Sequence, residues 1–180
     1  MMLTKLKLSK FVFVVIVVIL AGVGGYLLPR KLAVKEVPAL YKVVEVVDGD
    51  TILVELNNQI ETVRLIGVDT PEVAHPEKPI ECFGEEATQR AKELLENQMV
   101  YLIPDSLSSN QGKYGRILRY VFLQDGLLIN AELIKEGFGF NYIYEPFQFM
   151  KQFDYLEKQA KENRLGLWGE ECNYYFEIEE

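Results

Sequence analysis

A pair of strand-like segments joined by Asn57-Asn58 constrains the fold more than any other feature of the sequence. Residues 51–56 are rich in β-branched and apolar side chains, and residues 59–68 alternate in the way expected of a strand with two different faces. Two asparagines between such segments predict a tight hairpin turn. In that hairpin Thr51 lies opposite Arg64.

The remaining segments add strands and helices in a mixed order. Further strands are predicted at residues 41–47, 99–103 and 116–123, and helices at 84–97, 128–136 and from about 149 to about 166. The polar stretch 105–115 is predicted to be a loop. Strands gathered around one intervening helix fit an α+β domain, a small, partly open five-stranded β-barrel of the OB type with three helices. Such barrels commonly bind oligonucleotides.

The N-terminal part differs from this domain in composition. Residues 11–28 carry no charge and follow a basic segment, residues 1–10. As a hydrophobic helix this run would be about 27 Å long, close to the thickness of a bilayer's hydrocarbon core. It is therefore a transmembrane anchor, or a signal segment cleaved near the small residues 21–25, and in both cases the domain lies outside the cytoplasm, at the cell membrane or secreted. Residues 29–38 are a linker and 39–180 the folded domain.

Cys82 and Cys172 are the only cysteines in the chain. An oxidising compartment would permit a disulfide between them, although two unrelated buried thiols fit the sequence as well. Two cysteines cannot form a four-cysteine zinc site. His75 is the only histidine, which excludes nuclease mechanisms that need two.

The net charge of -8 argues against binding nucleic acid through bulk electrostatics. A nucleic-acid substrate would have to be held by local contacts.

The hairpin register gathers acidic side chains at one end of the two strands. Asp48, Asp50 and Asp69 are brought together there with Arg64. Carboxylates so close repel one another unless a cation or an arginine lies between them. Each acid alone would more often be a turn residue, but the set predicts a site for a hard cation, and its loose oxygen ligands favour Ca²⁺ over Mg²⁺.

Four separated motifs give the chain a resemblance to a known family. They are Val47-Asp48-Gly49-Asp50-Thr51, Arg64-Leu65-Ile66-Gly67-Val68-Asp69-Thr70-Pro71-Glu72, Lys113-Tyr114-Gly115-Arg116 and Gly166-Leu167-Trp168. In this order and spacing they resemble the thermonuclease family, typified by staphylococcal nuclease, over about residues 41–168. The resemblance implies hydrolysis of DNA and RNA with Ca²⁺ as cofactor, releasing 5′-hydroxyl ends and 3′-phosphorylated products.

The resemblance also implies a set of metal ligands. Asp50, Asp69 and the backbone carbonyl of Thr70 would hold Ca²⁺, with Asp48 in a supporting position. The ion would neutralise charge that grows on the phosphate oxygens as the phosphorus becomes five-coordinate.

Three further side chains are implied as catalytic. Glu72 would orient or deprotonate the attacking water. Arg64 and Arg116 would clamp the phosphate, because a planar guanidinium can donate two parallel hydrogen bonds to phosphate oxygens.

Four residues match positions that lie beside the nucleotide in the family. Lys113 would approach a phosphate, and Tyr114, Tyr142 and Tyr144 would offer aromatic faces on which bases stack without sequence preference. Tyr142 and Tyr144 are two residues apart, so ordinary strand packing would explain that pair equally well.

Two other functions account for parts of the sequence. A catalytically silent OB-fold module, anchored at the membrane and binding nucleic acid or protein, is expected to have lost its catalytic residues, whereas this chain keeps Arg64, Glu72 and Arg116. A metal-stabilised envelope protein would explain the acidic charge but not the arginines. The calcium-dependent nuclease, acting as a monomer, is therefore the favoured interpretation.

The loops around the expected site predict altered substrate binding. The family's loop after the Glu72 position is rich in lysine, whereas residues 76–79 contain one lysine, and Glu145 replaces a familiar basic residue. Because lysines neutralise backbone phosphates, we expect weaker or more salt-sensitive binding than is typical of the family. Cleavage measured against ionic strength tests this, and a flat response would contradict it.

Overall fold

The structure is a computed structural model that describes residues 38–73, 81–172 and 174. The expected basic segment, the apolar run and nearly all of the linker lie outside these residues, as does His75. Within the described ranges, no helix has the length and apolar character needed to span a bilayer.

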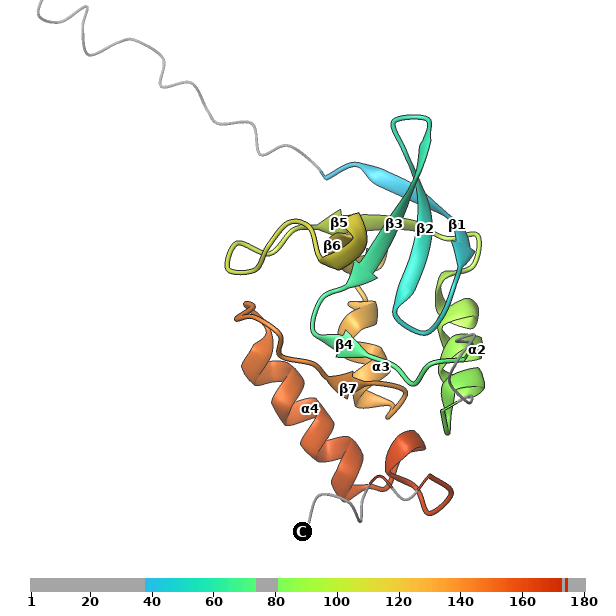
Figure 1. Ribbon diagram of the computed structural model, residues 1–180, viewed down its shortest axis with the longest axis vertical. Coiled ribbons are helices and arrows are strands. Elements are labelled where there is room, and N and C mark those ends of the chain that lie inside the picture. The colour runs from blue at the N-terminus through green and yellow to red at the C-terminus, as the bar shows by residue number, and fades with distance from the viewer. Residues whose placement is uncertain (1–37, 74–80, 173, 175–180) are drawn as a thin grey trace, which may run out of the picture. The chain divides into compact units, whose positions relative to one another are not determined.

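Five strands form a closed barrel (Figure 1). They are β1 (Leu40–Val46), β2 (Thr51–Leu56), β3 (Gln59–Leu65), β5 (Met99–Ile103) and β6 (Ile117–Leu123), in the spatial order β1-β2-β3-β6-β5. The barrel closes because β1 pairs with both β2 and β5, while β3 and β6 pair in parallel. A register shift in β1 between Val43 and Glu45 accompanies its bend from one partner to the other. The expected OB-type barrel is thus confirmed, but it is closed rather than partly open.

The β2–β3 hairpin has the predicted register. Thr51 pairs with Arg64 and Leu56 with Gln59. Asn57 and Asn58 both have positive φ, 52° and 62°, as a two-residue hairpin turn requires.

The third predicted strand, residues 59–68, is broken into two. β3 ends at Leu65, and Gly67, with φ 72°, turns the chain into a short strand, β4 (Val68–Asp69). β4 pairs with β7 (Phe140–Asn141), which the sequence did not predict. The turn changes the direction of the chain, so that Asp69 and Thr70 lie beside the start of β2 and do not extend β3 along the barrel.

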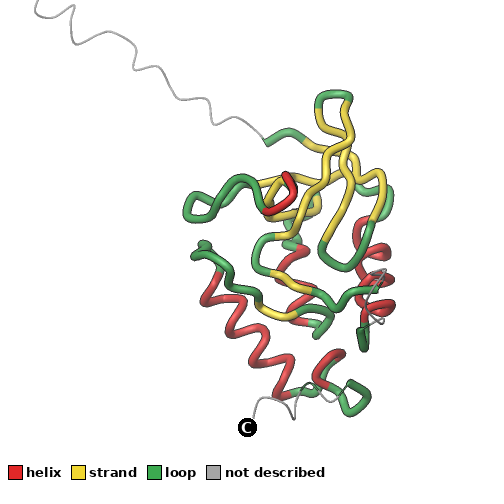
Figure 2. The backbone as a smooth tube through the Cα atoms, in the orientation of Figure 1, coloured by secondary structure: helices red, strands yellow, loops and turns green. Residues whose placement is uncertain are grey.

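In the described residues, three α-helices accompany the barrel, as expected (Figure 2). They are α2 (Gly84–Leu95), α3 (Ile129–Lys135) and α4 (Met150–Glu162), and short 3₁₀ turns occur at Lys113–Gly115 and Gly166–Trp168. The first and last helices are shorter than predicted. Asn97, with φ 60°, follows the end of α2, and Arg164, with φ 54°, follows the end of α4.

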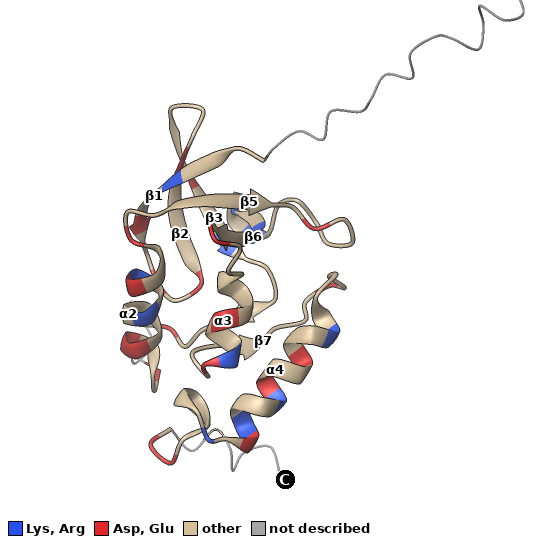
Figure 3. Cartoon of the chain, turned by 180° about the vertical axis from the view of Figure 1, so that it is seen from behind, with Lys and Arg blue, Asp and Glu red and all other residues tan. Residues whose placement is uncertain are grey.

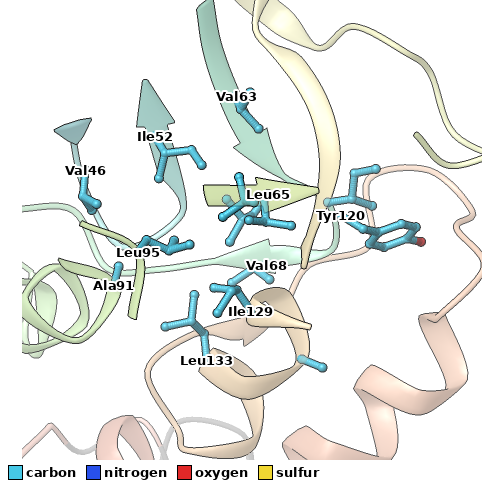
Figure 4. Packing of buried hydrophobic residues seen from close by; sticks show 14 of the residues in the cluster. Val46, Ile52, Val63, Leu65, Val68, Ala91, Leu95, Tyr120, Ile129 and Leu133 are labelled. Atoms are coloured by element: carbon cyan, nitrogen blue, oxygen red, sulfur yellow. The ribbon is translucent and has the colours of Figure 1, made fainter. Parts of the chain in front are cut away.

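The main core lies where the barrel meets α2 and α3 (Figure 4). Ile52, Val63 and Leu65 of the barrel pack in one buried cluster with Ile129 and Leu133 of α3. Burying each such side chain contributes about 1.5–3 kcal/mol.

Asn130 of α3 is a fully buried polar residue that links this helix to the barrel. Its side-chain Nδ2 donates to the carbonyls of Ile66 (2.9 Å) and Arg119 (3.2 Å), and its Oδ1 accepts from the N–H of Val121 (2.9 Å). The amide satisfies backbone groups just before the Gly67 turn, so α3 supports the segment that carries Asp69.

A second, smaller cluster holds the C-terminal part of the domain. Leu167 and Trp168 are buried there with Ala160, and Phe83 and Phe140 pack against them. Cys82 and Cys172, 90 residues apart, form a disulfide beside this cluster. The residues after α4 are therefore fixed to the start of α2.

Gly137 allows a close backbone approach inside this region. The N–H of Leu167 donates to the carbonyl of Gly137 at 2.8 Å. Gly137 has φ +78°, and a Cβ there would lie 2.3 Å from the carbonyl oxygen of Leu165. Gly126 also has positive φ, +93°, but a Cβ there would meet no atom within 4 Å.

Replacing Gly126 or Gly137 by alanine distinguishes the stability cost of backbone strain from that of a steric clash. We expect Gly126→Ala to cost about 1 kcal/mol, because an L-residue is strained at positive φ. Gly137→Ala should cost about 1–3 kcal/mol more, because backbone atoms must also move. Denaturant unfolding of both variants measures the difference, and equal losses would contradict the close approach.

Candidate functional site

The candidate site lies at the end of the β2–β3 hairpin, where the register brings three chain segments together. Asp50 immediately precedes β2, Arg64 lies near the end of β3, and Asp69 ends β4. The N–H of Leu65 donates to the carbonyl of Asp50 at 2.9 Å, which ties the two strands together at this point. The expected gathering of acids around Arg64 is present in the structure.

Asp50 is buried and is held by hydrogen bonds on both carboxylate oxygens. Oδ2 accepts from the N–H of Thr70 at 2.9 Å and from its hydroxyl at 3.3 Å, while Oδ1 accepts from the hydroxyl of Thr51 at 3.0 Å. Asp48 supports the same turn, because its Oδ1 accepts from the N–H of Asp50 at 3.0 Å. Asp50 and Thr70, two of the three residues predicted to hold the metal, are therefore in contact through the N–H and the hydroxyl of Thr70.

Arg64 lies between the two predicted carboxylate ligands. Its guanidinium forms ion pairs with Asp50 and, at 2.6 Å, with Asp69. It also donates to the carbonyl of Val68 at 2.7 Å. In this arrangement Arg64 supplies the positive charge that keeps the two carboxylates together.

The site carries more negative than positive charge. Burial raises the pKa of Asp50 to about 7; Arg64 opposes this, while Asp48 and Asp69 add to it. Burial also raises the pKa of Asp69, with Glu81 and Asp48 adding to the shift against Arg64. One guanidinium does not compensate three aspartates, so a further cation would be stabilised here.

The donor set fits a hard cation. Among the described residues, no group of three or more His, Cys, Asp or Glu side chains is arranged to hold a metal ion. The predicted set does not need one, because it has two carboxylates and the carbonyl of Thr70. Oxygen-only ligands, completed by water, suit Ca²⁺.

Glu72 lies three residues beyond Asp69 and is exposed. Two hydrogen bonds hold its main chain to Glu81: the N–H of Glu81 donates to the carbonyl of Glu72 at 3.0 Å, and the N–H of Glu72 donates to Oε2 of Glu81 at 3.1 Å. The sequence did not predict this role of Glu81, because no local pattern distinguishes one glutamate from another in a polar stretch.

Arg116 lies just before β6, the strand that pairs with β3, which carries Arg64. It directly precedes Ile117, and Ile117 pairs with Val63 in the parallel β3–β6 ladder. Neighbouring strands are about 4.8 Å apart, so both arginines belong to the same end of the barrel. Within the described part of the chain, the buried Nε of Arg116 has no hydrogen-bond partner. An arginine with an unsatisfied donor is suited to an anionic ligand.

The predicted substrate-binding residues are exposed. Tyr114 and Tyr144 are 81% and 84% exposed, and Tyr142 and Tyr144 stack with centroids 6.5 Å apart. Tyr142 and Tyr144 follow β7 in an irregular segment, so ordinary strand packing does not explain them. Lys113 lies over the ring of Tyr114 at 4.8 Å; a hydrogen bond with Tyr114 raises the pKa of Lys113, and Tyr144 adds to the shift. The lysine and the tyrosines therefore border one surface.

A network that the sequence did not reveal connects the two loops of this surface. Asp105 is buried and accepts hydrogen bonds from the hydroxyl of Tyr120 and from the N–H of Gln148 (2.8 Å). Burial alone would raise the pKa of Asp105, but these hydrogen bonds and two from the following backbone outweigh it and lower the pKa. Glu145 accepts from the N–H and the hydroxyl of Ser109, at 2.6 and 2.9 Å. Glu145 thus joins the loop before β6 to the segment that carries Tyr144.

Comparison with known proteins now identifies the family. A sequence model of the family described as Staphylococcal nuclease homologue matches residues 62–170. A thermonuclease of Staphylococcus hyicus is 37% identical over 129 residues, which make up 71% of this chain and 75% of that protein. The chain belongs to the staphylococcal nuclease family.

Other similar proteins come from different organisms. An uncharacterized protein of Methanocaldococcus jannaschii is 37% identical over 146 residues, covering 71% of this chain and 70% of that protein. The endonuclease YncB of Bacillus subtilis is 40% identical over 124 residues, covering 68% and 58%. The family model begins within β3, so it covers Arg64, Asp69 and Arg116 but not Asp50.

In this staphylococcal nuclease fold, the helices away from the candidate site carry charge of both signs. Acidic and basic side chains alternate along α2 and α4 (Figure 3). Surfaces of mixed charge do not favour binding of a polyanion.

The raised pKa of Asp50 predicts a pH dependence of stability in the metal-free protein. Because the pKa is raised from 3.8 to about 7 in the folded state, the folded protein holds this proton more tightly than the unfolded chain. The resulting stability is complete below about pH 4 and is lost as the pH rises through about 7. Wild type should therefore lose stability relative to Asp50→Asn across that range, in denaturant unfolding with a chelator present.

Asp154→Asn, at an exposed position on α4, is the matched control and should show no such pH-dependent difference. A constant difference between wild type and Asp50→Asn over the same range would mean that Asp50 is ionised throughout and that Arg64 dominates its pKa.

Proposed function

We propose that this protein is a calcium-dependent, nonspecific nuclease that hydrolyses phosphodiester bonds of DNA and RNA to 3′-phosphorylated products. The observation that carries the proposal is that Arg64 of β3, and Arg116 just before the neighbouring strand β6, lie at the end of the barrel where an acidic cluster has an excess of negative charge. Carboxylates that suit a cation and guanidinium groups that suit an anion thus lie at one end of the barrel, as a metal-assisted reaction of a phosphodiester requires.

Asp50, Asp69 and the carbonyl of Thr70 are the residues that would hold Ca²⁺. The bound ion would polarise a phosphate oxygen and neutralise part of the charge that develops on it. The contribution of this chain is a rigid ligand set, because Asp50 is fixed by Thr51 and Thr70.

Arg116 and Arg64 would bind the phosphate. The unsatisfied Nε of Arg116 leaves its guanidinium ready to donate to an oxyanion. Arg64 is already held within the acidic cluster, and the carboxylates that hold it are those proposed to bind calcium. Preorganised donors of this kind stabilise the five-coordinate transition state more than the bound substrate.

Glu72 would act on the attacking water. Its carboxylate is exposed, as a group that exchanges protons with solvent must be, while its main chain is held by Glu81. In the proposed step the water oxygen attacks phosphorus and one of its protons passes to Glu72. The bond to the 5′ oxygen breaks, and a proton from solvent water converts the departing alkoxide into the 5′-hydroxyl.

Stacking explains how an acidic protein would bind nucleic acid without reading sequence. Tyr114, Tyr142 and Tyr144 present exposed rings beside Lys113. Base stacking on aromatic side chains contributes about 1–3 kcal/mol per base and tolerates every base.

The disulfide supports a position outside the cytoplasm. Cys82 is exposed, and such bonds persist in oxidising compartments. Together with the apolar run 11–28, this supports a monomeric nuclease that is anchored at the membrane, or secreted if that run is cleaved. Two of the similar proteins are named Thermonuclease and Endonuclease YncB, in keeping with this activity.

The proposal predicts calcium-dependent cleavage that needs Glu72. The full chain, kept in mild detergent, should cleave single-stranded DNA with calcium and not with chelator. Glu72→Gln should lower kcat by about 10²–10⁴-fold, because the water loses its base. Product ends should be 5′-hydroxyl and 3′-phosphate, as end-labelling can establish.

Glu86→Gln, at an exposed position on α2, is the control and should cleave like wild type. A silent binding module would retain the DNA without cutting it. Equal cleavage by wild type and Glu72→Gln would overturn the role given to Glu72.

A further inference from the structure

The residues after α4 form a rigid anchor. Leu167 and Trp168 are buried, and the ring of Trp168 packs edge-on against Phe140 at 5.3 Å. The hydrogen bond from Leu167 to Gly137 fixes the backbone of the same turn. Cys172 follows this anchored segment closely.

The disulfide links the segment after α4 to the start of α2. Cys172 is bonded to Cys82, which is the neighbour of Glu81. Phe83, on the other side of Cys82, packs against the same small cluster as Trp168. The entrance to α2 is therefore fixed to the C-terminal anchor both covalently and by packing.

Glu81 in turn holds Glu72. Its N–H and its carboxylate make the two hydrogen bonds to the main chain of Glu72, at 3.0 and 3.1 Å. Gly84, whose N–H donates to the carbonyl of Glu81 at 3.1 Å, lets the backbone of Glu72 approach closely. A Cβ at Gly84 would lie 2.9 Å from the carbonyl oxygen of Glu72.

These noncovalent links are weak on their own. The side-chain bond between Glu72 and Glu81 is exposed, and such hydrogen bonds contribute about 0.5–1.5 kcal/mol each. The N-cap of α2, Phe83, makes no side-chain capping bond and has positive φ, 71°. Without the covalent tie, only the packing of Phe83 and these hydrogen bonds would hold this end of the helix and the position of Glu72.

We propose that the Cys82–Cys172 disulfide is a positioning element of the active site, which acts through Glu81 to hold the main chain of Glu72 in register with the phosphate-binding groups. The proposal rests on the role given above to Glu72. A general base must be placed within hydrogen-bond reach of its water, and misplacement by about 1 Å can cost on the order of 10²-fold in rate.

The test is a double-mutant cycle on the full chain. Wild type, Cys82→Ser/Cys172→Ser, Glu72→Gln and the triple variant are compared in single-stranded DNA cleavage with saturating calcium. Breaking the disulfide in wild type should lower kcat on the order of tenfold, with KM within about twofold. In the Glu72→Gln background the same change should have no further effect on kcat.

Melting curves at assay conditions show whether each variant is folded. Equal losses of kcat in both backgrounds would overturn the proposal, because the disulfide would then act on stability alone. An unchanged kcat in Cys82→Ser/Cys172→Ser would overturn it as well. If Glu72→Gln alone cleaves like wild type, the role proposed for Glu72 is wrong. This comparison does not involve the cysteine variants, so it is distinguished from a failure of the disulfide proposal.

Variants of Glu81 keep the proposal testable should the cysteine variant not fold. Glu81→Ala removes the acceptor for the N–H of Glu72 and should lower kcat as far as loss of the disulfide does. Glu81→Gln keeps an acceptor oxygen and should restore kcat to within about twofold of wild type. Equal losses in both variants, or no loss in Glu81→Ala, would overturn the relay through Glu81.

Discussion

The position of Arg64 between Asp50 and Asp69 is the interaction on which the proposed site depends. It joins the start of β2, the end of β3 and the short strand β4, which are separated by turns in the chain. Burial and the surrounding acids raise the pKa of both carboxyl groups, so the cluster is held together against its own repulsion. A cation that binds the two aspartates would relieve this repulsion, and Arg64 would then be available to an anion.

The rest of the fold keeps this cluster in place. The Gly67 turn and the β4–β7 pair carry Asp69 back toward Asp50, and Asn130 satisfies the carbonyl of Ile66 just before that turn. Asp105 holds the segment around Gln148, near the exposed tyrosines. The proposed binding groups thus lie at strand ends and on loops that are tied to buried elements, which is how a small barrel can offer a preorganised site.

The sequence predicts the local parts of this arrangement well. The Asn57-Asn58 turn fixes the hairpin register, because alternation and turn chemistry act between near neighbours, and the register alone places Asp50 near Arg64. Strand β7 was not predicted, because a strand of two residues shows no periodicity and its partner β4 lies about 70 residues earlier in the sequence. Barrel closure and the links from Glu81 to Glu72 depend on contacts between distant segments, which no local pattern encodes. The anchor or signal segment, residues 11–28, stays a prediction.

A crystal structure with Ca²⁺ and a non-cleavable dinucleotide would show whether the acidic cluster and the two arginines act on one phosphate. We expect one calcium ion bound by Asp50, Asp69 and the carbonyl of Thr70, with the guanidinium groups of Arg64 and Arg116 donating to the same phosphate. Calcium bound elsewhere, or a phosphate without contact to either arginine, would contradict it.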